Sequence, residues 1–203
     1  REYMLVDGAM GTQMQERGLD ALEAVPELLC KTHAADITAI HAAYIAAGAE
    51  VVTTNTFSAN RLKLGDKMSV VEAYRLAADC ARAAGAPYIA GDIGPTGSLL
   101  EPMGTLSFDE AYDIFAEQVR AAVAAGCDII LVETMADLRE AKAALLAARE
   151  NSTLPVFVTM TFGEDGRTFL GTTPEIAAEV LSSLGAQAVG LNCSLGPAEL
   201  TGA

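Results

Sequence analysis

Basic residues are scarce in this chain of 203 residues, and they form no cluster. Only 13 Lys and Arg stand against 27 Asp and Glu, so the formal net charge at pH 7 is −14. The phosphate backbone of a nucleic acid would be repelled by that charge rather than bound. We therefore expect no nucleic acid among the partners of this protein.

Cysteines are also few, and they lie far apart. The chain contains four, which are Cys30, Cys80, Cys127 and Cys193. They form neither a CxxC pair nor the close spacing of a secreted disulfide framework, which indicates a reducing compartment. Long apolar runs are missing too, because none approaches the roughly 20 residues that a transmembrane helix needs. We expect a cytoplasmic protein with no membrane association.

Two nucleotide-binding motifs are absent, and so is a histidine pair suited to a metal. The turn after the first predicted strand reads DGAMGT at 7–12, which is not GxGxxG, and no Walker A motif occurs. His33 and His41 are too far apart for the i, i+4 pair that binds zinc on one face of a helix. A dinucleotide-binding fold is therefore disfavoured.

What the chain does contain is a repeated pattern. A predicted helix ends in small residues and glycine, an apolar run follows, and a polar or glycine-containing turn comes next. Six strands are predicted in this way, at 3–6, 50–56, 87–92, 128–133, 154–160 and 187–192. Alanine-rich stretches with apolar residues at three- and four-residue spacing predict helices at 34–47, 69–84, 108–125, 137–149 and 174–184. The chain is thus a series of about six parallel βα units.

Two architectures are compatible with a series of parallel βα units, a doubly wound open sheet and a (β/α)8 barrel. Polar residues follow nearly every predicted strand, and such a ring of side chains converges only if the sheet curls. The ring consists of Asp7, Thr54, Asn55, Asp92, Glu133, Thr161 and Cys193. We predict an α/β fold of the TIM-type (β/α)8 barrel class, as one domain over residues 1–203. A complete barrel takes about 250 residues, so we expect the last two βα units to be missing.

Cys193 follows the last predicted strand, within the sequence GLNCSLGP at 190–197. A cysteine just past the carboxyl end of a buried barrel strand is placed to be a metal ligand or a nucleophile. Zinc takes three or four protein ligands, so Cys193 alone would not hold it. The other three cysteines are interpreted as small core residues.

Six motifs together resemble one known family. They are DGAMGT at 7–12, TNTF at 54–57, GDIGPTG at 91–97, ET at 133–134, MTF at 160–162 with GR at 166–167, and GLNCSLGP at 190–197. In this order they resemble the homocysteine-binding domain of the zinc-dependent homocysteine S-methyltransferases, and within that family the N-terminal module of cobalamin-dependent methionine synthases. The resemblance spans essentially the whole chain.

The resemblance implies a barrel whose rim binds L-homocysteine through its sulfur to zinc. Cys193 matches one zinc ligand of the family, and a Gly-Gly-Cys-Cys-Gly motif that supplies the others does not occur in this sequence. Zinc would hold the substrate as a thiolate, whereas a free thiol with a pKa near 8.5 is mostly protonated at pH 7. Methylcobalamin is the implied methyl donor, and cobalamin- and folate-binding modules of the same full-length protein are the implied partners.

The amino and carboxylate groups of an amino acid substrate also need partners. Glu133 ends an apolar run and is expected to pair with the substrate ammonium, a role that the resemblance also assigns to it. Asp7 lies likewise at the end of the first strand, and the N–H groups of Gly8 and Ala9 are candidates for the substrate carboxylate. Thr54 and Asn55 complete the candidate substrate-binding residues.

Each of these candidates also has a plainer interpretation. Glu133 would then pair with a neighbouring strand or cap the next helix, and Asp7 would belong to an ordinary Asp-Gly turn. Thr54 and Asn55 would only hydrogen-bond the loops at the rim.

Other functions remain open at this stage. The methyl donor can instead be betaine or S-methylmethionine, or the chain can be an inactive barrel fragment that needs its C-terminal complement. An aldolase with a Schiff-base lysine is ranked low because no lysine lies within a predicted strand.

Overall fold

The protein is an α/β structure built on one parallel sheet. The computed structural model describes residues 3–19, 23, 25–193 and 196. The strands are β1 (Val51–Thr53), β2 (Tyr88–Ile93), β3 (Ile129–Met135), β4 (Val156–Met160) and β5 (Ala188–Leu191). Their order in the sheet is the same as their order in the chain, and every neighbouring pair is parallel. A doubly wound sheet reverses its strand order at a switch point, so this order is that of a barrel.

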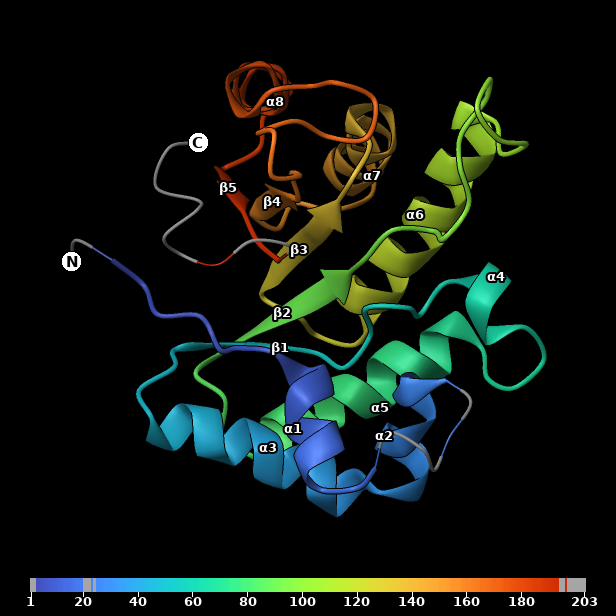
Figure 1. The fold of residues 1–203 in the computed structure, drawn as a ribbon. Coiled ribbons are helices and arrows are strands. Elements are labelled where there is room, and N and C mark those ends of the chain that lie inside the picture. Colours follow the sequence, from blue (N-terminus) through green and yellow to red (C-terminus); the bar gives the residue numbers. More distant parts are fainter. Residues whose placement is uncertain (1–2, 20–22, 24, 194–195, 197–203) are drawn as a thin grey trace.

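Helices cover one face of this sheet. The helices with ten or more residues are α3 (Ala34–Ala46), α5 (Val70–Ala83), α6 (Phe108–Ala124), α7 (Leu138–Asn151) and α8 (Pro174–Ser183). Figure 1 shows that they pass around the sheet from α3 and α5 below β1 to α8 beside β5. All five had been predicted from the spacing of their apolar residues. Ser107 begins α6 with a capping box to Glu110, as its sequence indicates.

The shorter helices were not among the elements expected from the sequence. They are α1 (Met10–Glu16), the 3-10 helix η1 (Pro26–Leu28), α2 (Leu29–Thr32) and α4 (Arg61–Leu64). Each has at most seven residues, which is too short for apolar periodicity to become visible.

The first predicted strand, at 3–6, is not a strand. Val6 forms a single parallel bridge with Val51, and the carbonyl oxygen of Leu5 accepts hydrogen bonds from the N–H groups of Glu50 and Val51. The segment therefore runs alongside β1 in the expected direction. Its side chains from Tyr3 to Val6 are exposed, so burial does not support longer pairing.

The core lies mostly between the sheet and the helices. Val52, Ile130 and Val158 point into it from the strands, and Tyr74 and Phe115 point into it from the helices. Glycine at 91 lets α6 approach β2 closely, since a Cβ there would lie 2.7 Å from Cβ of Ala122.

The opposite face of the sheet is covered much less. It holds a small apolar cluster of Val51, Ala90, Ile129 and Leu131, with Phe157 packed against it. Above this cluster, toward the carboxyl ends of the strands, the face opens into a cavity. No helix among the described residues is long and apolar enough to cross a membrane.

Candidate functional site

A cavity of about 660 Å³ lies on the inner face of the sheet, at the carboxyl ends of the strands. It is bordered by the turn at 6–11, by the ends of β1, β2 and β3, and by the segment 188–193. All the site residues predicted from the sequence line it, namely Asp7, Gly8, Ala9, Thr54, Asn55, Glu133 and Cys193. The structure therefore brings together residues that are up to 186 positions apart (193 − 7) in the chain.

Asp7 is anchored by the end of β1. The N–H of Thr53 donates to its Oδ2 at 3.0 Å, and the hydroxyl of Thr53 donates to its Oδ1 at 3.0 Å. Burial raises the pKa of Asp7 to about 6, although these hydrogen bonds act in the opposite direction. The carboxyl group is thus held in one orientation while it faces the cavity.

The turn after Asp7 is fixed by helix α3. The hydroxyl of Tyr44 donates to the carbonyl oxygen of Ala9 at 2.9 Å, and a Cβ on Gly8 would come within 3.0 Å of the Tyr44 ring. Among the described residues, no hydrogen bond is donated by the N–H of Gly8 or of Ala9. These two groups are therefore free to face a ligand in the cavity.

Glu133 lies inside β3, two residues before the strand ends. Nδ2 of Asn192 donates to its Oε2 at 3.4 Å. Burial, and then the negative charge of Asp7, raise the pKa of Glu133 to about 7. Two carboxyl groups with raised pKa values therefore face the same cavity, and each is costly to ionise without a cation beside it.

Asn192 connects Glu133 to Cys193 and was not among the predicted site residues. Its Oδ1 accepts from the hydroxyl of Thr159 at 2.9 Å and from the N–H of Thr134 at 3.1 Å. Its Nδ2 donates to Oγ1 of Thr134 at 2.8 Å and lies 3.6 Å from Sγ of Cys193. The only sequence signal for this role is its position directly before Cys193.

Cys193 is exposed, whereas Cys30, Cys80 and Cys127 are buried, as their interpretation as core residues expects. Its Sγ lies 3.7 Å from Oγ1 of Thr134. The thiol is therefore the one among the described cysteines that a solute can reach at the cavity.

Two further carboxyl groups in the cavity wall are almost fully buried. Asp92 is 4% exposed and Glu27 is 2% exposed, and burial raises the pKa of both. Oδ1 of Asp92 and Oε2 of Glu27 have no hydrogen-bond partner among the described residues. The sequence placed Asp92 in the polar ring without a role, and Glu27 carried no signal because it lies far from any predicted strand.

Thr54 and Asn55 use their polar groups within the protein. Oγ1 of Thr54 accepts from the N–H of Asp92 at 3.0 Å, and Nδ2 of Asn55 donates to the carbonyl oxygen of Pro26 at 2.9 Å. These contacts agree with the plainer interpretation of both residues. Their contact with a ligand stays a prediction.

The metal-binding chemistry of the cavity fits zinc in ligand type but not in ligand number. Cys193 offers an accessible thiol, which is a preferred zinc ligand. No group of three or more His, Cys, Asp or Glu residues in the described part of the chain could hold a metal ion. Any zinc at Cys193 would need ligands from outside these residues.

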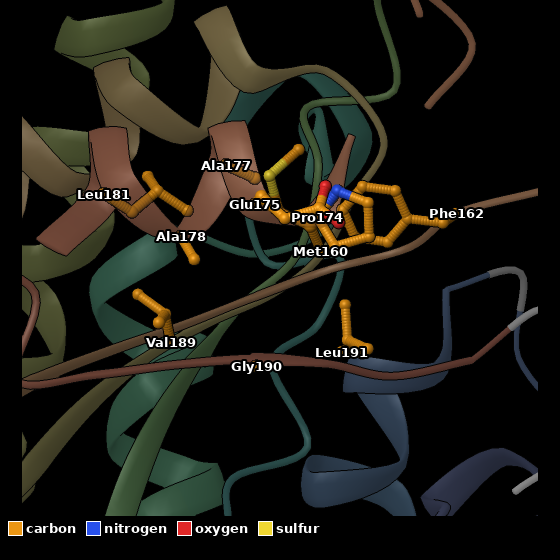
Figure 2. A pocket seen from close by; sticks show the side chains of 10 residues that line it. All are labelled: Met160, Phe162, Pro174, Glu175, Ala177, Ala178, Leu181, Val189, Gly190 and Leu191. Carbon is orange, nitrogen blue, oxygen red and sulfur yellow. The ribbon is translucent and has the colours of Figure 1, made fainter. Parts of the chain in front are cut away.

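A second cavity, of about 380 Å³, lies between α8 and the strands β4 and β5. Figure 2 shows Ala177 and Leu181 of α8 facing Val189 and Leu191 across it. Its lining is apolar apart from Glu175, and it contains none of the predicted site residues. The site residues predicted from the sequence therefore all line the first cavity.

Comparison with known proteins finds similar sequences. Residues 4–203 match the family model described as homocysteine S-methyltransferase. A methionine synthase of Mycobacterium leprae (strain TN) is 35% identical over 222 residues, and one of Mycobacterium tuberculosis (strain ATCC 25618 / H37Rv) is 35% identical over 223 residues. Each match covers 99% of this chain and 18% of the relative, so the chain spans about a fifth of the length of these proteins.

Solved structures share the fold. The apo form of the homocysteine methyltransferase MmuM from Escherichia coli superimposes with a TM-score of 0.73 at 20% identity, over 96% of this chain and 73% of that chain. The metallated form of the same protein gives a TM-score of 0.67 at 16% identity, over 98% and 94% of the two chains. The predicted barrel class is therefore confirmed.

Proposed function

Because the chain belongs to the homocysteine S-methyltransferase family, we propose that it transfers a methyl group to the thiol of L-homocysteine, which gives methionine. The observation that carries this proposal is the cavity in which two carboxyl groups, a turn with free N–H groups and an accessible thiol meet. An amino acid with a thiol side chain presents the complementary groups, which are an ammonium, a carboxylate and a sulfur atom.

Asp7 and Glu133 bind the substrate ammonium in this proposal. A cation between them offsets both the burial and the mutual repulsion that raise the pKa of Glu133. Binding of the amine therefore favours loss of a proton from the pair. Charge-assisted hydrogen bonds of this kind are about twice as strong as neutral ones.

The N–H groups of Gly8 and Ala9 bind the substrate carboxylate. Two successive backbone N–H groups in a turn form a favourable site for an anion. Tyr44 holds this turn in place through its hydrogen bond to Ala9. Because Asp7 precedes the turn directly, the ammonium and the carboxylate of one α-carbon can be bound side by side.

The thiol of Cys193 would help to hold a zinc ion in this proposal. Such an ion would supply Lewis acidity, which would favour the deprotonated form of the substrate thiol. Cys193 supplies one ligand, and we propose that the others come from outside residues 1–203, in two further βα units of the same barrel domain. The length of the curated relatives supports this, since the chain covers 18% of each.

Methylcobalamin is the proposed methyl donor, carried by another module of the full-length protein. The similarity to proteins named methionine synthase, and their length, support cobalamin- and folate-binding modules as partners of this domain. All four cysteines are free, which supports a cytoplasmic location.

A methyl-transfer assay on the full-length natural protein tests the proposal. L-homocysteine is incubated with methylcobalamin, betaine or S-methylmethionine in turn, and methionine is measured. We expect turnover with methylcobalamin. Turnover with one of the other two donors would contradict the donor assignment, and no methionine with any donor in zinc-loaded protein would contradict the function itself.

A further inference from the structure

The main chain of Asp92 is held by three hydrogen bonds. Its N–H donates to Oγ1 of Thr54 at 3.0 Å, and its carbonyl oxygen accepts from Oγ1 of Thr56 at 2.8 Å and from the hydroxyl of Tyr74 at 2.7 Å. None of these contacts uses the carboxyl group. The carboxyl group itself accepts a hydrogen bond from the backbone of Ile93.

The carboxyl group of Asp92 nevertheless lies buried in the wall of the cavity. It is 4% exposed, and its Oδ1 has no hydrogen-bond partner among the described residues. Burying a polar atom without a partner destabilises the folded protein. An unpartnered buried group of this kind calls for an explanation, and a partner supplied by a bound ligand is one.

Asp92 shares the inner face of the sheet with Glu133 and Asp7. Asp92 is paired with Leu131, two residues before Glu133, so both side chains project to the same face. On the other side, Thr53 binds Asp7 and is paired with Ala90, two residues before Asp92. Burial, and then the charges of Glu133 and Asp7, raise the pKa of Asp92 well above its usual range.

Three of the four carboxyl groups that line the cavity therefore come from three neighbouring segments, and Glu27 is the fourth. A metal ion is a poor match, because no group of three His, Cys, Asp or Glu residues within the described chain has metal-binding geometry. An ammonium group matches better, since it has three N–H donors that point in different directions.

We propose that Asp92 is a further substrate-binding residue, whose Oδ1 accepts the third N–H of the substrate ammonium. This inference rests on the proposed function, in which Asp7 and Glu133 accept the other two. It predicts that Asp92 recognises the amino group and contributes nothing to recognition of the thiol or the carboxylate.

The test compares two ligands that differ only in the amino group. L-homocysteine and 4-mercaptobutanoate share the thiol and the carboxylate, and only the first has an ammonium. Their dissociation constants are measured by calorimetry on full-length protein, as wild type and as Asp92→Asn. Asp113→Asn is the control, because it removes the same charge from an exposed position on α6.

Asp92→Asn should weaken binding of L-homocysteine about tenfold, as expected for one hydrogen bond to a charged group. It should change binding of 4-mercaptobutanoate less than twofold, and Asp113→Asn should change neither. Asp92→Ala should weaken binding of L-homocysteine more than Asp92→Asn does, again without weakening binding of 4-mercaptobutanoate. Its melting temperature checks that the variant is folded. Equal weakening of both ligands would assign Asp92 a structural role and overturn the inference.

Asp7→Asn and Glu133→Gln separate this inference from the proposed function. If both variants lose L-homocysteine selectively and Asp92→Asn does not, the proposed function stands and the inference about Asp92 fails. Wild-type protein that binds the two ligands equally, or binds neither, would overturn the ammonium site as a whole.

Discussion

Thr134 and Cys193 share the same left-handed backbone conformation, with φ of 59° in each, and Oγ1 of Thr134 lies 3.7 Å from Sγ of Cys193. They are the only two non-glycine residues with positive φ among those described. This conformation costs of order 1 to 3 kcal/mol in such residues and is found mainly at functional sites. Asn192 stabilises it through its hydrogen bonds with the N–H and hydroxyl groups of Thr134.

Asn192→Ala should therefore damage both stability and binding. The change removes the shared partner of Glu133, Thr134 and Thr159, and we expect a loss of roughly 1 to 3 kcal/mol in the free energy of unfolding. L-homocysteine should bind at least tenfold more weakly, as measured by calorimetry.

Asn151→Ala is the matched control for that variant. Asn151 donates to the carbonyl oxygen of Ala147 and the hydroxyl of Tyr112, outside the cavity lining. It should lose a comparable amount of stability without weakening binding. The role given to Asn192 is wrong if both variants bind L-homocysteine equally well.

Cys193→Ala should remove zinc from the full-length protein. Loss of one thiolate from a site with three protein ligands should reduce the metal content, measured by atomic absorption, from about one equivalent to almost none. Methyl transfer should fall with it. Cys127→Ala, which removes a buried thiol outside the cavity lining, should keep both. Full zinc content in Cys193→Ala would refute the metal assignment.

Glu133→Gln should change how stability depends on pH. The pKa of Glu133 is raised from 4.5 to about 7, first by burial and then by the charge of Asp7. The folded state thus keeps a proton that the unfolded chain loses, and the stability that this proton gives is full below pH 4.5 and lost as the pH rises to about 7.

Glutamine does not titrate, so Glu133→Gln does not lose stability in this way as the pH rises. Urea titrations should show its free energy of unfolding gaining roughly 1 to 3 kcal/mol relative to wild type between pH 4.5 and 7. Glu164→Gln changes an exposed carboxyl group. Its free energy of unfolding should depend on pH in the same way as that of wild type. A constant difference between Glu133→Gln and wild type across this range would contradict the raised pKa.

His41→Leu should stabilise the protein, most of all in acid. His41 is fully buried in α3, and neither ring nitrogen has a hydrogen-bond partner among the described residues. Burial lowers its pKa from 6.5 to about 4, so its contribution to stability is lost as the pH falls from 6.5 to 4.

Leucine does not titrate, so the variant does not lose stability in acid through this position, and no buried polar atom is left without a partner. We expect a gain of about 1 kcal/mol at pH 7, which grows by roughly 1 to 3 kcal/mol toward pH 4. His33→Leu, at a half-buried position, serves as the control. Thermal unfolding at pH 4, 5.5 and 7 measures the effect, and a variant that is less stable than wild type at pH 4 would disprove it.

The long elements were predictable because their patterns repeat. Apolar residues at three- and four-residue spacing indicated the five longer helices, and glycines such as Gly85 and Gly126 indicated where α5 and α6 end. The polar residues after the strands indicated where the cavity lies. The segment at 3–6 had a strand-like sequence, but pairing depends on cover from other elements, which a local pattern does not contain.

The hydrogen bonds within the cavity could not be predicted from repeating sequence patterns. Asn192 bonds Thr134 across 58 residues of chain, and Glu27 binds the N–H of Ser58 across 31. A sequence shows that a residue is polar, whereas its hydrogen-bond partner depends on which loops pack together. The burial of Asp92 could not be predicted for the same reason, although its position at the end of a strand could be.

The strand order of the sheet bears on how the chain folds during synthesis. Since β1 to β5 are neighbours in the order in which they leave the ribosome, each new strand meets a partner that is already in place. Loop closure between successive strands then spans one or two helices at a time, which keeps its entropic cost small. Asp7 and Asp92 would be anchored early in this course, and Cys193 would join them only after β5 has docked. The exposed thiol of Cys193 is therefore the last, in chain order, of the described groups that line the cavity.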